Sequence, residues 1–254
     1  MAKIAIFDSG LGSLSIIKAI QKVSQSEIIY FADQQNYPYG NKSQAQISKI
    51  IQKSIKLLEE KFSPDIIVIA SNTPSLMLNI TTKRIIDVKP PLKEAARISK
   101  TKQIGILATK SAINSKGLIQ HIKKNNFSKK INIFKINGSG LVELVESGKF
   151  ISNKKFCQKI IKNVLSDILF QNNIDTITLS STHLPFLNSL LKKQFPKINF
   201  IDPSENVARK ILLLIKNKQS KKNSLKIFAS GDIEIFQNKL DKIRIKNKVN
   251  FLSF

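Results

Sequence analysis

The sequence predicts an α/β protein built from two similar halves, each with a mostly parallel sheet. Short apolar runs alternate with longer amphipathic ones along the 254 residues, which is the pattern of strand–helix–strand units. Segments 65–73 and 175–183 repeat each other at an offset of 110 (175 − 65 = 110), and each places a serine where an apolar strand runs into polar residues. A second pair, 4–9 and 104–109, repeats at an offset of 100 (104 − 4 = 100). We therefore expect two facing half-domains that bring both serine loops to one cleft.

Eight short apolar runs are expected to form the strands. They are rich in isoleucine and other residues that favour strands, and polar or turn-forming residues bound them. The expected strands are 3–7, 28–31, 66–70, 104–108, 131–135, 176–180, 198–201 and 226–229.

The first helices follow from apolar spacing and from helix-breaking residues. Helix 12–23 carries three isoleucines on one face, and helix 44–61 ends before the Ser-Pro pair at 63–64. The stretch 87–91 is expected to be a turn, and its last residue, Pro91, suits the first position of the next helix.

The chain is expected to form two domains, with its last stretch returning to the first. The turn at 87–91 precedes the second half, and the crossing back lies near Arg209. Residues 1–95 plus 210–254 therefore form the first expected domain, and residues 96–209 form the second. With 42% hydrophobic residues the chain can bury either one large core or two smaller ones.

A formal net charge of +25 raises the question of a nucleic-acid partner. Only four of the 42 basic residues are arginine, which leaves 38 lysines (42 − 4 = 38), whereas recognition of bases and phosphates favours the arginine fork. The lysines are spread at solvent-facing helical spacings, with one denser stretch at 216–222. This distribution favours a compositional bias over a nucleic-acid surface, and it would also steer an anionic substrate.

The single cysteine, Cys157, excludes an intramolecular disulfide and fits a reducing cytosol. It lies on an apolar helical stripe, so we expect it in the core. Together with His121 and His183 it makes no recognisable metal site. The amino terminus lacks the features of a signal peptide, and no window approaches the ~20 apolar residues of a membrane span. We expect a soluble, cytoplasmic protein with no membrane partner.

Polar clusters follow the expected strands at their carboxyl ends, where ligands bind in open α/β sheets. One such cluster alone would be ordinary loop chemistry, because Asp, Asn, Ser and Gly make turns and caps. Five of them offer hydroxyls, an amide, backbone N–H groups, a carboxylate and an imidazole, which suit a small ligand carrying an amine and carboxylates. The clusters are 8–10, 38–40, 71–73, 109–111 and 181–183.

Seven motifs, in order along nearly the whole chain, resemble those of glutamate racemases in the cofactor-independent aspartate/glutamate racemase superfamily. The motifs are 6–15, 30–40, 70–73, 141–148, 181–187, 201–208 and 230–232. The resemblance implies two Rossmann-like parallel-sheet αβ domains, related by a pseudo-two-fold axis, with glutamate or a related acidic amino acid in the cleft between them. It implies catalysis with no cofactor and no metal. It is also compatible with a homodimer.

The resemblance also implies which residues hold and serve the substrate. Three of them, Asp8, Glu146 and His183, match the family's supporting acid/base residues, although the segment before Glu146 departs from the family pattern. The implied substrate-binding residues are Asp8, Ser9, Tyr39, Gly40, Asn72, Thr73, Thr182 and His183.

The family's two catalytic cysteines fall on Ser71 and Ser181 in this chain. In the family one thiolate removes the α-proton and the opposite thiol delivers a proton to the other face. A free thiol has a pKa of ~8.5, whereas the pKa of an aliphatic alcohol is closer to the ~15.7 of bulk water. This gap of roughly 7 units corresponds to about 10 kcal/mol. Both serines can still hydrogen-bond to a ligand.

Three hypotheses follow. The first is a glutamate-binding protein whose racemase activity is lost or greatly reduced. The second is an active racemase that interconverts L- and D-glutamate, or a related isomerase with a reassigned base such as His183 or Asp8. The third is a basic homologue that binds nucleic acid or a protein.

Overall fold

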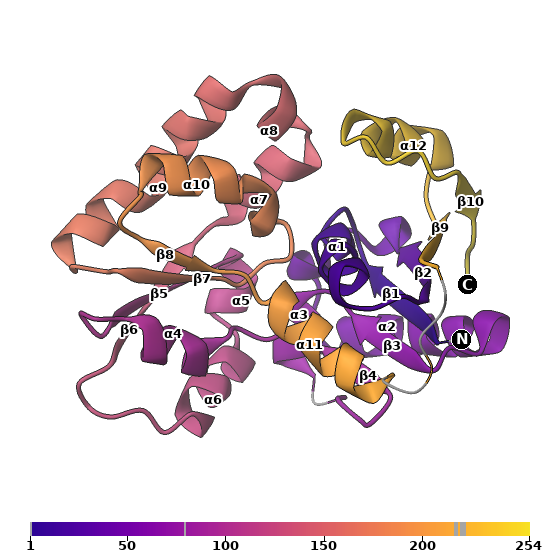
Figure 1. Ribbon diagram of the computed structural model, residues 1–254, viewed down its shortest axis with the longest axis horizontal. Coiled ribbons are helices and arrows are strands. Elements are labelled where there is room, and N and C mark those ends of the chain that lie inside the picture. The colour runs from indigo at the N-terminus through magenta and orange to yellow at the C-terminus, as the bar shows by residue number, and fades with distance from the viewer. Residues whose placement is uncertain (1, 79, 216–217, 219–221) are drawn as a thin grey trace. The chain divides into compact units, whose positions relative to one another are not determined.

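A computed structural model describes residues 2–78, 80–215, 218 and 222–254. Two compact units make up the structure, each with its own parallel sheet (Figure 1). Unit 1 comprises Met1–Val88 and Ser204–Phe254, and unit 2 comprises Lys89–Pro203. The predicted fold class of two parallel-sheet α/β domains is confirmed. The expected domain boundaries, after 95 and after 209, fall inside helices α4 and α11 described below.

Unit 1 contains a six-stranded sheet in the order β10-β9-β2-β1-β3-β4. Its strands are β1 Lys3–Asp8, β2 Glu27–Ala32, β3 Ile66–Ile69, β4 Ile85–Asp87, β9 Ser224–Ala229 and β10 Val249–Phe251. Its helices are α1 Ser13–Val23, α2 Gln44–Phe62, α3 Asn72–Met77, α11 Ser204–Leu214 and α12 Ile233–Lys242, with short 3₁₀ turns at Gln34–Asn36 and Tyr39–Asn41. The dense lysine stretch at 216–222 lies outside the described residues except at 218 and 222.

Unit 2 contains a four-stranded sheet in the order β6-β5-β7-β8. Its strands are β5 Gln103–Ala108, β6 Asn132–Asn137, β7 Thr176–Leu179 and β8 Asn199–Ile201. Its helices are α4 Leu92–Ile98, α5 Lys110–Ile113, α6 Lys116–Lys124, α7 Ser139–Glu146, α8 Lys149–Ser152, α9 Lys154–Gln171 and α10 Asn188–Gln194, with a 3₁₀ turn at Leu184–Leu187. Pro91 lies one residue before α4 rather than at its first helical position.

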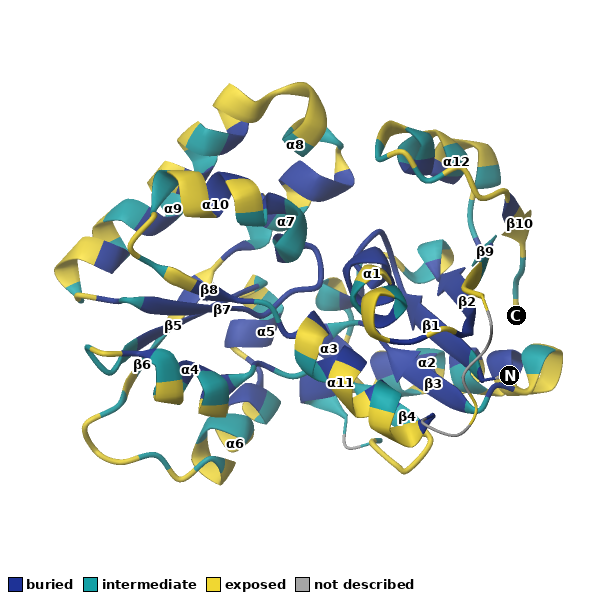
Figure 2. Ribbon diagram, in the orientation of Figure 1, coloured by how far each residue is buried: buried dark blue, intermediate teal, exposed yellow. Residues whose placement is uncertain are grey.

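The central strands of both sheets are buried on both faces, as expected for parallel sheets covered by helices (Figure 2). In unit 1 the side chains of β1, β2 and β3 pack with the inner face of α2. In unit 2 the core gathers residues of β5 and β7 with those of α7, α9 and α10. Cys157 on α9 is fully buried in this second core, which confirms its expected position.

The sequence repeats occupy equivalent places in the two sheets. In unit 1, β1 lies between β2 and β3, and Ile4 is in register with Ile28 and Ile66. In unit 2, β5 lies between β6 and β7, and Ile104 is in register with Ile133 and Thr176. The repeated serine loops therefore follow equivalent strands, β3 and β7.

The aspartate that opens each repeat fastens the start of its strand. Asp65 accepts hydrogen bonds from the backbone N–H of Lys3 at 2.9 Å and from the Lys218 ammonium at 2.7 Å. Those two hydrogen bonds lower the pKa of the Asp65 carboxyl. Asp65 thus holds the start of β3 through hydrogen bonds, and Asp175 holds its own surroundings in the same way.

Asp175 anchors the loop that follows α4. Its carboxylate accepts hydrogen bonds from the Ser99 hydroxyl at 2.6 Å and from the backbone N–H groups of Lys100 and Thr101 at 2.7 and 3.0 Å. Burial alone would raise the pKa of Asp175, but these bonds and one from the Thr176 hydroxyl outweigh it and lower the pKa. The ionised carboxylate therefore stabilises unit 2.

Replacing Asp175 with Asn is expected to destabilise unit 2 by about 2 kcal/mol at pH 7, because hydrogen bonds to a charged group contribute roughly 1.5–3 kcal/mol. The folded-state pKa is below the unfolded value, so this contribution is complete above an unfolded pKa of about 3.9 and is lost as the pH falls through the folded pKa. Urea unfolding of both proteins at neutral pH and at about pH 3 measures the effect.

The matched control is Asp167→Asn, which removes an exposed carboxylate from α9 of the same unit. It is expected to leave stability unchanged at both pH values. An Asp175→Asn deficit of equal size in acid would contradict the role given to the ionised carboxylate.

Candidate functional site

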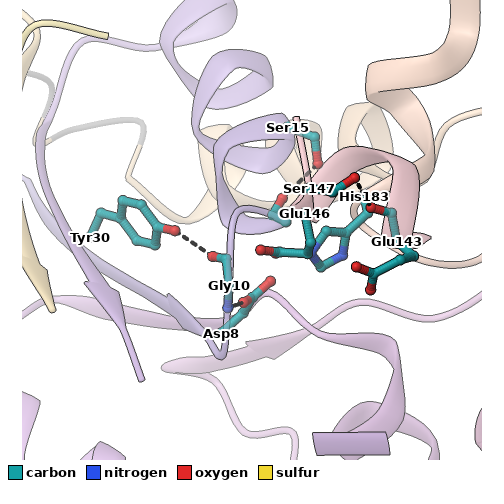
Figure 3. Close-up of polar contacts among 9 residues, drawn as sticks. Asp8, Gly10, Ser15, Tyr30, Glu143, Glu146, Ser147 and His183 are labelled. Carbon is teal, nitrogen blue, oxygen red and sulfur yellow. Dashed lines mark hydrogen bonds and ion pairs between the residues drawn. The ribbon is translucent and has the colours of Figure 1, made fainter. Parts of the chain in front are cut away.

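The first polar cluster of unit 1 lies at the carboxyl end of β1. Asp8 is the last residue of this strand and is 1% exposed. Its carboxylate accepts a hydrogen bond from the backbone N–H of Gly10, whose carbonyl oxygen accepts one from the Tyr30 hydroxyl (Figure 3). Ser9 between them is also buried. The turn after β1 is thus held from both sides, and its carboxylate has a fixed orientation.

The loop after β3 carries Ser71, Asn72 and Thr73 beside β1, because β1 and β3 are paired. The Asn72 side-chain amide donates to the backbone carbonyl of Val88 at 2.9 Å. Its side-chain carbonyl oxygen is buried and has no hydrogen-bond partner among the residues that the structure describes. Asn72 is therefore held as an acceptor, and a ligand that donates a proton would satisfy it.

Ser71 is half-buried and precedes α3 directly. Its backbone carbonyl accepts a hydrogen bond from the Ser75 hydroxyl at 2.6 Å, and the Ser75 oxygen accepts one from the backbone N–H of Val88 at 3.1 Å. The backbone at Ser71 is therefore fixed.

Tyr39 and Gly40 lie in the 3₁₀ turn that follows the cis Tyr37–Pro38 peptide bond. The Tyr39 hydroxyl donates to the Asp33 carboxylate at 2.9 Å. Burial, together with the negative charge of Asp33, raises the pKa of Tyr39 well above its usual value, so the phenol stays protonated. The predicted site residues omitted Asp33, although it lies in the motif 30–40 and directly after strand β2, much as Asp8 ends β1.

In unit 2, Ser181, Thr182 and His183 follow the carboxyl end of β7, and all three are buried. The carbonyl of Ser181 accepts a hydrogen bond from the backbone N–H of Leu184 at 3.0 Å, which closes the turn.

His183 pairs with Glu146, the last residue of α7. The Nε2 atom of His183 lies 2.6 Å from Oε1 of Glu146, and the two residues are 8% and 7% exposed (Figure 3). An ionised carboxylate only accepts, so Nε2 is the donor of this bond whenever Glu146 is ionised. The structure thus brings together two residues that are 37 positions apart in the chain.

The expected cluster at 109–111 serves as a helix cap. Thr109 accepts a hydrogen bond from the backbone N–H of Ala112, and its hydroxyl lies 3.1 Å from that of Ser111. The backbone N–H of Lys110 donates to the Ser139 hydroxyl. These bonds are ordinary loop and capping chemistry.

The structure therefore gathers the candidate residues into one strand-end group per unit. The unit 1 group consists of Asp8, Ser9, Tyr39, Gly40, Ser71, Asn72 and Thr73, and the unit 2 group consists of Glu146, Ser181, Thr182 and His183. Within the described residues no three His, Cys, Asp or Glu side chains are placed to hold a metal ion. No helix in the described ranges is long and apolar enough to cross a membrane.

Comparison with known proteins matches the chain to curated glutamate racemases. A curated glutamate racemase from Buchnera aphidicola subsp. Schizaphis graminum is 35% identical over 238 residues, which cover 87% of this chain and 88% of the relative. A curated glutamate racemase from Aliarcobacter butzleri is 32% identical over 227 residues, or 86% of each chain. No family model matches the chain.

A solved structure has the same fold. It is the glutamate racemase from Francisella tularensis in complex with D-glutamate, with a TM-score of 0.81 and 24% identity, and the match covers 99% of this chain and 97% of that one.

Proposed function

Because the chain belongs to the glutamate racemase family, we propose that it binds glutamate or a related acidic amino acid and that its racemase activity is lost or greatly reduced. One observation carries the proposal: serine stands at 71 and 181, where we place the family's two cysteines, beside otherwise complete strand-end groups. An alcohol at each position lacks the acidity that proton removal from carbon requires. It keeps the ability to bind a ligand.

The unit 1 group supplies contacts suited to the ammonium end of an amino acid. The orphan carbonyl oxygen of Asn72 needs a donor, and the Asp8 carboxylate provides negative charge at the neighbouring strand end. A ligand ammonium satisfies both. We assign the remaining ligand contacts to Ser9, Tyr39, Gly40, Thr73, Thr182 and His183.

The relatives support glutamate as the ligand. All three comparison proteins are named glutamate racemases, and one of them was solved with D-glutamate. Their names give no support to the hypothesis of a nucleic-acid- or protein-binding homologue. A homodimer and a cytoplasmic location stay predictions.

Calorimetric titration of the full chain with D- and L-glutamate tests the proposal. We expect saturable binding of at least one enantiomer, and Asn72→Leu is expected to weaken it about tenfold or more, because the ligand then loses a buried hydrogen bond. Asn206→Leu, which changes a partly exposed amide on α11, is the matched control. Absence of heat and of any thermal shift with both enantiomers would refute the binding function.

A second candidate, slow turnover by a reassigned base, is favoured by the buried His183–Glu146 pair, which retains a titratable imidazole at the strand end of unit 2. Deuterium incorporation at the α-carbon of each glutamate enantiomer in D₂O separates the two candidates. Exchange above the background of a His183→Gln variant would favour turnover, and none at any pH would leave binding alone.

A further inference from the structure

A buried carboxylate outside the proposed contacts lies close to one of them. Asp33 follows β2 directly and is 0% exposed. Each of its two oxygens accepts from the side-chain amide of Asn36, at 2.9 and 3.0 Å. One oxygen also accepts from the Tyr39 hydroxyl at 2.9 Å, and the other from the Ser230 hydroxyl at 3.2 Å. Burial raises the pKa of Asp33, and these neutral donors oppose the rise.

The network around Asp33 joins three separate pieces of unit 1. Asn36 ends the first 3₁₀ turn, Tyr39 begins the second, and Ser230 follows β9. The Ser230 hydroxyl oxygen also accepts the backbone N–H of Gln35 at 3.2 Å. Packing here is tight, because a Cβ atom built on Gly231 would lie 2.8 Å from Cβ of Gln34. The loop from 33 to 40 is thus fixed against the end of β9 through one carboxylate.

An amide could not replace this carboxylate at equal strength. A carboxylate accepts at both oxygens, whereas an asparagine accepts at one and presents two donors from the other position. Those donors would face hydroxyl and amide groups that already donate. A buried carboxylate is also costly to desolvate, so both of its oxygens must receive hydrogen bonds from nearby donors.

From this geometry we propose that Asp33 is a positioning residue for Tyr39: it holds the phenol and the 33–40 loop in the shape that binds the amino acid. The proposal rests on the proposed function, because the shape of the loop affects binding only if Tyr39 and Gly40 contact the ligand. Asp33 itself is not assigned a contact with the ligand.

The test is a double-mutant cycle on the affinity of the full chain for D-glutamate. Asp33→Asn is expected to raise Kd about tenfold, and to change it less than about twofold when Tyr39 is already Phe, because the link through the hydroxyl is then absent. Ser230→Ala removes another bond to the same carboxylate and the acceptor of the Gln35 N–H, but it spares the Tyr39 bond. It is the comparison variant, and it is expected to raise Kd less than Asp33→Asn does. Additive losses from Asp33→Asn and Tyr39→Phe would overturn the positioning role.

A spectroscopic measurement tests the link without any ligand. The chain has three tyrosines. Burial and, after it, the carboxylates of Asp33 and Asp8 raise the pKa of Tyr39, and the positive charge of Lys42 opposes the rise in the pKa of Asp33. In a tyrosinate absorbance titration, Asp33→Asn is expected to make one tyrosine ionise at a lower pH than in the wild type, and Tyr39→Phe is expected to remove that step. A titration unchanged by Asp33→Asn would overturn the link.

The two measurements separate the possible failures. A wild-type chain that binds neither enantiomer overturns the proposed function and the ligand role of Tyr39, while the titration still decides whether Asp33 holds the hydroxyl. If Asp33→Asn does not unfold cooperatively, Asp33→Glu, which keeps the charge but moves the oxygens, replaces it in the cycle. A loss of affinity that disappears in the Tyr39→Phe background supports the positioning role, and an additive loss overturns it.

Discussion

Converting Ser71 and Ser181 together to cysteine is expected to raise glutamate racemisation at least about 1000-fold over the wild-type chain. The thiol-to-alcohol gap in ionisation is worth about 10 kcal/mol, and a 1000-fold gain uses about 4 kcal/mol of it. Racemisation needs proton removal on one face and delivery on the other. Each single variant supplies one competent group and is therefore expected to stay near the wild-type rate.

Following the circular dichroism of pure D- or L-glutamate measures this reaction. The backbone at both serines is held by hydrogen bonds, at Ser71 through Ser75 and Val88 and at Ser181 through Leu184. A cysteine at either position is therefore expected to take the place of the serine without moving the loop. Wild-type turnover equal to that of the double variant would show that serine suffices and would refute the proposed loss of activity.

The second large effect concerns stability. Replacing Glu146 with Ala is expected to cost unit 2 about 3 kcal/mol of its free energy of unfolding, because His183 would lose its hydrogen bond to Glu146 at a buried position. Glu143→Ala removes an exposed carboxylate from the same helix α7, and it is expected to change stability by less than about 0.5 kcal/mol. Denaturant unfolding of the two variants compares them directly. Equal stabilities would contradict a structural role for the His183–Glu146 pair.

The long buried strands could be predicted from the sequence, whereas two short edge strands could not. β1, β2 and β5 are apolar runs bounded by polar residues, so composition alone defines them. β4 and β10 have three residues each and lie at the two edges of the unit 1 sheet. Three residues carry no measurable periodicity, and pairing with a longer neighbour makes β4 and β10 strands. The equally short β8 could be predicted because it lies in the mostly apolar run 198–201.

The same distinction holds for the site. Strand ends could be predicted, and parallel pairing then places Asp8 and Asn72 at one edge of the unit 1 sheet. The hydrogen-bond partners of the site residues could not be predicted, because those partners depend on the paths of the loops. The amide of Asn72 is bound by a residue 16 positions away, and the Tyr39 hydroxyl by Asp33 across a turn containing a cis-proline.

The insertion of unit 2 into unit 1 sets the order in which a ribosome can complete the two. Lys89–Pro203 is one uninterrupted stretch, and all strands of its sheet emerge together. The unit 1 sheet lacks β9 until residues 224–229 have been made, and during that time the nascent chain carries β2 with an open hydrogen-bonding edge. Synthesis therefore completes the strands of unit 2 before those of unit 1. The unpaired edge of β2 stays open to misassociation until residues 224–229 have been made.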